Sequence, residues 1–157
     1  MKVGIIGPLE FIIKIKKIII NEFKDIEAIN LVYNEYIETP EILRLHQSHL
    51  DGVLFSGYIP YEFAKRNIIP IIPWESIPRN GVYIPRVLLE VAQLGTNILN
   101  LSFDCYNDYF IYEAYEESGI PIEKLNIYIT EDKPIDEHYL DYVYRFHKDN
   151  YLRGVSA

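Results

Sequence analysis

The stretch Asp51-Gly-Val-Leu-Phe-Ser-Gly-Tyr-Ile-Pro-Tyr61 decides the fold class of this chain. Its apolar run, residues 52–55, shows no polar alternation, which is typical of a strand buried on both faces of a parallel sheet. The glycine turn Ser56-Gly57-Tyr58 follows, and Pro60 suits the start of a helix. This order of strand, turn and helix predicts a junction at the carboxyl end of a strand, where open α/β sheets bind ligands.

The rest of the chain alternates between the same two kinds of segment, and no hairpin signal interrupts the alternation. The predicted strands are 2–6, 28–33, 52–55, 68–73, 97–103 and 125–130, and the predicted helices start after Pro8 and near residues 39, 60, 85, 107 and 136. This pattern predicts an α/β fold with a doubly wound, mainly parallel sheet, in a flavodoxin-like or Rossmann-like three-layer sandwich. At 157 residues we expect a single domain, residues 1–157.

Two segments carry expectations beyond their secondary structure. In the first helix, Ile13, Ile18 and Ile20 widen the apolar face, which predicts that this helix is covered on more than one side. At the other end, residues 153–157 resemble the opening of another strand. We therefore expect one complete lobe of a larger protein.

Composition narrows the classes of partner and compartment. The net charge of −8 argues against binding of a phosphate backbone by these residues, because that affinity comes from clustered Lys and Arg. The single cysteine, Cys105, excludes an internal disulfide and fits a reducing cytoplasm. Lysines interrupt the apolar run 11–20, so neither a signal peptide nor a membrane span is expected. The prediction is a cytoplasmic protein whose own residues do not bind a phosphate backbone.

Motifs for several common α/β chemistries do not occur at the expected strand ends. Gly7-Pro8 and Ser56-Gly57 stand where a receiver domain needs its acidic pair and its phosphoacceptor Asp. Gly4 and Gly7 alone make neither a dinucleotide fingerprint nor a P-loop. His46 and His49 lie one helical turn apart without a further ligand type nearby, so neither a metal nor a cofactor is expected.

Loops at the carboxyl ends of parallel strands meet at one edge of a sheet, and here they carry the candidate binding residues. Small residues, hydroxyls and aromatics suit recognition of a small polar molecule, and they form no nucleophile–base pair. Arg86 is expected in the first turn of its helix, next to free N–H groups that can hold an anion. The predicted ligand-binding residues are Gly7, Pro8, Ser56, Gly57, Tyr58, Trp74, Ser76 and Arg86.

Three parts of the sequence carry a resemblance: residues 52–61, residues 81–90, and residues 144–147 followed by 154–157. They resemble N-terminal sensory regions of bacterial transcription regulators. The pattern of the whole chain is similar to the two-lobed sensor of propionate-type activators, which is related to periplasmic-binding-protein folds. This resemblance implies an effector bound between lobes, with contributions from Ser56, Gly57, Tyr58 and Arg86. It also implies a second lobe and a DNA-binding domain outside these residues.

The sequence therefore predicts a non-enzymatic sensing domain of a cytoplasmic bacterial regulator, with a small-molecule effector as its partner. Two alternatives stay open. A small α/β enzyme would use Cys105 or Asp104, which follow the fifth predicted strand. A dimerisation module would bury the aromatic surface and the stripe of helix 136–148, which contains Leu140, against a second copy to give a homodimer.

Overall fold

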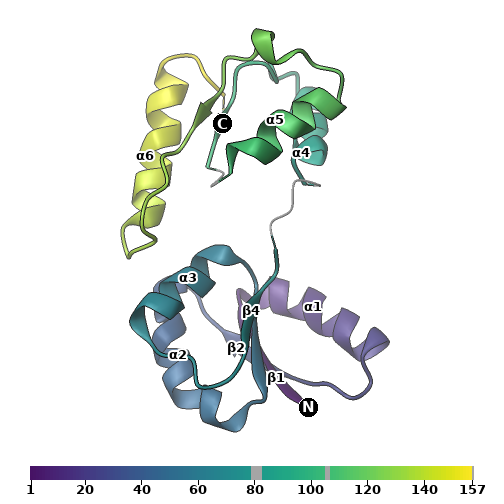
Figure 1. Cartoon of the computed structure of the whole chain (residues 1–157), viewed down its shortest axis with the longest axis vertical. Coiled ribbons are helices and arrows are strands. Elements are labelled where there is room, and N and C mark those ends of the chain that lie inside the picture. The colour runs from purple at the N-terminus through teal and green to yellow at the C-terminus, as the bar shows by residue number, and fades with distance from the viewer. Residues whose placement is uncertain (79–82, 105–106, 157) are drawn as a thin grey trace. The chain divides into compact units, whose positions relative to one another are not determined.

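The computed structural model describes residues 1–78, 83–104 and 107–156 and divides the chain into two compact units (Figure 1). The N-terminal unit is Met1–Arg79 and the C-terminal unit is Asn80–Ala157. Both units are built from parallel strands and helices. The single domain expected from the sequence therefore stays a prediction that an unfolding experiment can test.

The N-terminal unit contains a parallel sheet in the order β2-β1-β3-β4. The central strand β1 (Lys2–Gly7) pairs with β2 (Glu27–Val32) on one side and with β3 (Gly52–Phe55) on the other. The short strand β4 (Trp74–Ser76) pairs with β3 and ends the sheet. The strand order reverses between β1 and β3, so this boundary is the switch point at which doubly wound sheets bind ligands.

Helix α1 (Leu9–Glu22) covers one face of this sheet (Figure 1). Its buried residues recur at helical spacing and pack with Ile5 of β1: Ile12, Ile15 and Ile19. Other isoleucines of the helix remain more than half exposed: Ile13, Ile18 and Ile20. Within the described residues of one chain, only one face of α1 packs on the sheet, so the expectation that α1 is covered on more than one side stays a prediction.

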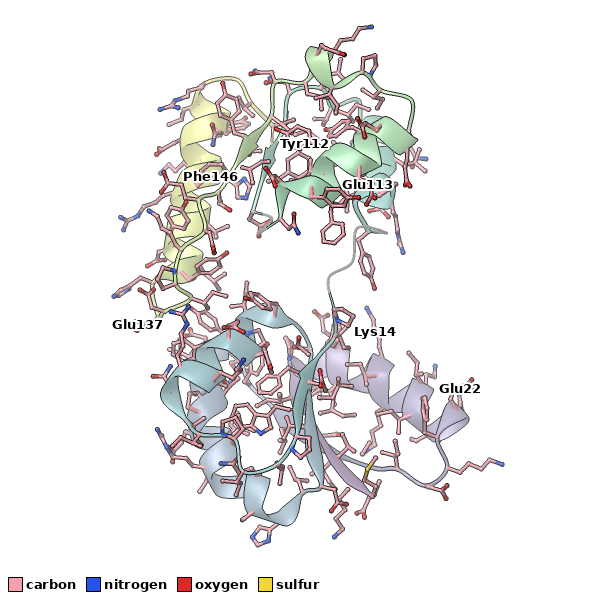
Figure 2. The ribbon with its side chains drawn as sticks, viewed as in Figure 1. Lys14, Glu22, Tyr112, Glu113, Glu137 and Phe146 are labelled. Atoms are coloured by element: carbon pink, nitrogen blue, oxygen red, sulfur yellow. The ribbon has the colours of Figure 1, made fainter. Side chains whose placement is uncertain are left out.

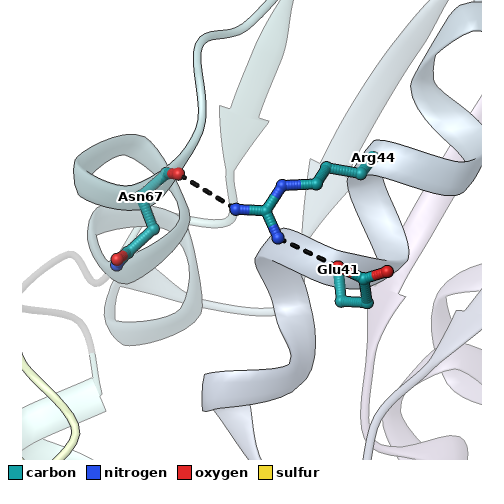
Figure 3. A network of polar contacts seen from close by, with 3 residues as sticks. All are labelled: Glu41, Arg44 and Asn67. Carbon is teal, nitrogen blue, oxygen red and sulfur yellow. Dashed lines mark hydrogen bonds and ion pairs between the residues drawn. The ribbon is translucent and has the colours of Figure 1, made fainter.

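The opposite face is covered by α2 (Thr39–His46) and α3 (Tyr58–Asn67), which pack against each other (Figure 1). A 3₁₀ turn, Tyr36–Glu38, leads into α2, and another, Gln47–His49, follows it. The Arg44 guanidinium joins the two helices, since it pairs with the Glu41 carboxylate at 2.9 Å and donates to the Asn67 carbonyl at 3.5 Å (Figure 3). With helices on both faces of a parallel sheet, the predicted α/β class is confirmed.

The fourth strand lies later in the chain than the sequence predicted. The prediction placed it at 68–73, but pairing with β3 runs from Trp74 to Ser76. Pro70 and Pro73 lack the N–H group that a strand ladder requires. The chain therefore joins β3 only at Pro73, whose carbonyl accepts from the Val53 N–H at 3.0 Å.

The C-terminal unit has its own parallel sheet, formed by β5 (Ser102–Phe103) and β6 (Tyr128–Ile129). The expectation of one sheet for all predicted strands is wrong for the described residues, in which β5 and β6 pair with each other and not with β1–β4. Ser156 forms a parallel bridge with Leu101, so the predicted opening of a further strand is confirmed at this position.

Helices α4 (Tyr83–Gln93), α5 (Asp108–Glu117) and α6 (Tyr139–Leu152) complete the C-terminal unit. A 3₁₀ turn, Ile122–Lys124, lies between α5 and β6. This unit has a hydrophobic core of its own, whose buried members come from α4, α5 and the residue before β5: Leu88, Ile111, Tyr115 and Leu101. The chain thus contains a separate core in each unit.

Candidate functional site

Gly7 and Ser56 face each other at the switch point, where β1 and β3 reach their carboxyl ends. A Cβ atom on Gly7 would lie 2.6 Å from the Ser56 Cβ atom and 2.8 Å from its Oγ atom, so only glycine leaves room for this serine. The Ser56 N–H donates to the Ile6 carbonyl at 2.9 Å, which holds the turn against β1. The structure therefore brings together two predicted site residues that are far apart in the sequence.

Tyr33 lies at the same edge, and sequence reasoning missed it as a site residue. Its Oη atom is 3.2 Å from Ser56 Oγ, and either hydroxyl can donate. The Tyr33 N–H donates to the Gly7 carbonyl at 3.2 Å, which places the residue directly after β2 and beside β1. Burial raises the pKa of Tyr33 above its usual value of 10.0, while the hydrogen bond with Ser56 acts in the opposite direction. Its signal in the sequence is its place as the last residue of the second predicted strand.

Two helices begin beside this junction, α1 after Pro8 and α3 after Gly57. The half-buried Pro8 is the N-cap residue of α1, and its carbonyl accepts from the N–H groups of Phe11 and Ile12 at 3.0 and 3.1 Å. Gly57 is the N-cap residue of α3 and has an extended backbone, with φ 178°. Apart from Gly57 itself and its two chain neighbours, no described atom comes within 4 Å of the position that a Gly57 Cβ would take. The half-buried Tyr58 then starts α3.

Of the two predicted residues from β4, only Ser76 lies at the carboxyl edge. It is the last residue of the strand and is in register with Phe55, the residue before Ser56. Trp74 is in register with Val53, farther from the edge, and its ring packs against Phe55 with 5.4 Å between the ring centroids. Within the described residues its buried indole N–H has no hydrogen-bond partner, which costs stability. Trp74 is thus a core residue, and its role in binding stays a prediction.

Arg86 belongs to the C-terminal unit, near the start of α4. Its side chain is exposed, and its Nε atom donates to Glu90 Oε1 at 2.9 Å, one helical turn later. The guanidinium is therefore engaged along its own helix, and anion binding by Arg86 stays a prediction.

Of the residues considered for an enzyme, Asp104 is half-buried after β5, whereas Cys105 lies outside the described residues.

The C-terminal unit contains a serine–histidine pair that the sequence did not reveal, because the two residues lie on distant segments. Ser102 Oγ is 2.8 Å from His147 Nδ1 and 3.2 Å from the Ser156 carbonyl oxygen. A nucleophilic serine must be accessible to its substrate, but Ser102 is only 5% exposed. We interpret this pair as a link between β5, α6 and the bridge at Ser156.

In residues 1–78, 83–104 and 107–156, no three His, Cys, Asp or Glu side chains gather in a way that could hold a metal ion. His46 and His49 are both exposed, the first at the end of α2 and the second in the 3₁₀ turn after it.

In the part of the chain that the structure describes, no helix combines the length and the apolar character that crossing a bilayer requires.

The fold is similar to that of a solved transcriptional regulator. The crystal structure of an NtrC family transcriptional regulator from Clostridium acetobutylicum matches over 99% of this chain and 84% of that chain, with a TM-score of 0.61 and 14% sequence identity. At this identity the likeness shows the fold alone, and the propionate-activator type expected from the sequence stays a prediction. No family model matches the chain, and no curated protein matches it.

Proposed function

We propose that the N-terminal unit binds a small polar effector at the carboxyl edge between β1 and β3, as the sensing part of a cytoplasmic bacterial transcription regulator. The proposal rests on one observation. Gly7, Ser56 and Tyr33 meet at this edge, and the space beside Gly57 is open. It occupies the switch point of a doubly wound sheet, where such folds bind their ligands. The neighbouring side chains of Ile6, Ile12 and Phe55 are fully buried, so a ligand would approach from the open side of Gly57.

The chemistry of this edge favours an effector with an anionic or hydrogen-bond-accepting group. The hydroxyls of Tyr33 and Ser56 can donate or accept. Helices α1 and α3 both start here, and the first turn of a helix carries a partial positive charge. Neither Pro8 nor Gly57 has a side chain that could cap its helix. A small carboxylate or phosphate ester therefore fits the edge better than a cation does.

The regulatory part of the proposal draws support from the neighbour's fold, which is an argument by analogy. The acidic balance of the chain, with a net charge of −8, is consistent with a sensor whose DNA contacts are made by another domain. A single cysteine is the usage expected in a reducing cytoplasm.

A thermal-shift screen with small carboxylates, phosphate esters, amino acids and nucleotides tests the proposal. A bound ligand stabilises the native state by about 2.7 kcal/mol when its concentration is one hundred times its Kd. We expect at least one compound to raise the Tm of the wild-type chain. Gly57→Val should abolish that shift, because its side chain would fill the open space that the ligand needs.

The matched control is Gly52→Ala, at the amino end of β3, the strand that precedes Gly57. A Cβ atom there would lie 3.4 Å from the Pro73 carbonyl oxygen, an ordinary contact, so the protein should fold and keep the ligand response. A ligand shift that survives Gly57→Val would place the binding site elsewhere. A screen without any stabilising compound would count against effector sensing itself.

A further inference from the structure

Helix α1 has a second apolar stripe, beside the face that packs on the sheet. Leu9, Ile13 and Ile20 are 54, 56 and 62% exposed. At spacings of four and seven residues these side chains line one side of the helix. Lys16 lies in the same stripe, and its Nζ atom donates to Asn30 Oδ1 of β2 at 3.3 Å. The stripe is therefore on the side of α1 next to the outermost strand.

Strand β2 continues this surface with unpaired backbone groups. It is the terminal strand of its sheet, and within the described residues no strand pairs with its outer edge. The N–H groups of Glu27 and Tyr33 donate inward, to the carbonyls of Met1 and Gly7. The backbone N–H groups of a strand point alternately to its two edges. The even-numbered residues between Glu27 and Tyr33 therefore point their N–H groups outward: Ala28, Asn30 and Val32.

Edge strands in soluble proteins are commonly protected by proline, by lysine or by a bulge. The β2 sequence, Glu-Ala-Ile-Asn-Leu-Val, contains neither proline nor lysine, and its six residues pair with β1 in unbroken register. Val32, at its carboxyl end, is 42% exposed. This edge has the features of a strand that pairs with another strand.

We infer that the stripe on α1 and the free edge of β2, together the α1–β2 surface, form an interface with a second copy of this chain. Pairing of β2 with its own copy across a twofold axis is antiparallel and self-complementary, so each outward donor meets an acceptor of the partner strand. The two sheets would become one continuous sheet, and the apolar stripes would lie next to each other on one of its faces. This surface differs from the stripe of α6 considered from the sequence.

Charge also favours contact between two N-terminal units. The nine basic and ten acidic side chains of Met1–Arg79 nearly cancel, whereas the six basic and thirteen acidic side chains of Asn80–Ala157 leave a net charge of −7. Two copies of the N-terminal unit therefore repel each other little. Lys14 and Glu22, on α1, illustrate this mixture of signs (Figure 2).

The exposed apolar area approaches what an interface needs. The exposed parts of Leu9, Ile13, Ile20 and Val32 amount to on the order of 400 Å² in each copy. A symmetric pair would bury roughly 800 Å² of this surface, and the paired β2 backbones add to it, toward the roughly 1,000 Å² that a specific interface needs.

Sedimentation velocity of the full chain and of paired variants tests the inference. We expect the wild type to sediment with the mass of two chains. Ile13→Glu should return it to the mass of one chain, because the charge enters the stripe. Ile18→Glu should leave the dimer intact, since Ile18 is 57% exposed on the same helix but lies outside the stripe. Both variants alter exposed side chains, so circular dichroism should show native folding.

A second pair of variants examines the strand edge. Val32→Pro removes an outward donor without touching the bonds to β1 and should weaken the dimer by at least tenfold in Kd, which is about 1.4 kcal/mol. Val32→Thr keeps the donor and the branched shape and should dimerise as the wild type does. A wild-type chain that stays monomeric, or equal behaviour of Ile13→Glu and Ile18→Glu, would overturn the inference.

Discussion

At the scale of single residues, Gly7 shows how the switch point depends on the absence of one carbon atom. A Cβ atom at this position would lie 2.6 Å from the Ser56 Cβ atom. We expect Gly7→Ala to destabilise the protein by about 1–3 kcal/mol, because β1 and the turn after β3 would have to move apart. Urea denaturation followed by tryptophan fluorescence measures this change, since Trp74 is in the same unit.

The matched variant is Gly57→Ala, one residue beyond Ser56. Its backbone is extended, and no described atom lies near the added carbon, so its effect on the free energy of unfolding should stay within about 0.5 kcal/mol. Gly7→Ala combined with Ser56→Gly should recover part of the lost stability. Equal effects of the two single alanine variants would refute the steric explanation.

Tyr115 makes stability depend on pH in the alkaline range. The residue is fully buried, its hydroxyl donates to the Ile98 carbonyl, and burial raises its pKa from 10.0 to about 12. A raised folded-state pKa means that the neutral form is stabilised below pH 10, and that this stability is lost as the pH rises toward 12. The contribution is on the order of 2–3 kcal/mol.

Urea denaturation between pH 9 and pH 12 of the wild type and Tyr115→Phe tests this prediction. At pH 9 the variant should be less stable by about 1 kcal/mol, because the Ile98 carbonyl loses its donor. The difference should shrink or change sign by pH 12, since phenylalanine has no proton to lose. Tyr144→Phe, which alters a side chain that is 66% exposed, is the control and should follow the wild type across the range. Parallel curves for wild type and Tyr115→Phe would contradict the prediction.

At the scale of secondary structure, helices were predictable because their ends are set by local chemistry. The predicted helix start near residue 107 is confirmed, since the Asn107 side chain caps α5 by accepting from the Tyr109 N–H at 3.0 Å. Gly119, shortly after the end of α5, has a positive φ of 72°, which is typical of a glycine that ends a helix. Both signals act within a few residues and need no partner elsewhere in the chain.

Strands were less predictable, because a strand exists only where another strand pairs with it. The apolar run 68–73 contains two prolines, and the ladder begins only after the second. The predicted strand 97–103 is shortened for a local reason: the Asn97 side chain accepts from the Leu99 N–H at 3.1 Å and the chain turns. The strand that follows is only Ser102–Phe103.

The same distinction explains which site residues could be predicted. Gly7 and Ser56 each end an apolar strand, so topology alone brings them to one edge. The contribution of Tyr33 depends on β2 lying directly beside β1, and the link between Ser102 and His147 joins segments 45 residues apart. The position of Tyr33 at the end of a predicted strand is visible in the sequence, but its partner is not, and the Ser102–His147 link leaves no local signal at all.

At the scale of the whole molecule, the two units have separate hydrophobic cores and separate sheets. Hydrophobic periodicity specifies which face of a segment is buried, but not which of several similar strands it joins. All the predicted strands therefore read as members of one sheet in the sequence. The charge difference between the units follows the same boundary, which falls in the segment between β4 and α4.

This division predicts two unfolding transitions that mutations can shift separately. Ile12 in the N-terminal core and Ile111 in the C-terminal core are both fully buried, and Trp74, the single tryptophan, reports on the N-terminal unit alone. Ile12→Ala should lower the stability measured by tryptophan fluorescence by about 2–5 kcal/mol. Ile111→Ala should shift part of the far-UV circular dichroism transition and leave the fluorescence transition in place. If both variants shift both signals equally, the chain unfolds as the single domain expected from its sequence, because a cooperative unit transmits a cavity in either core to every probe.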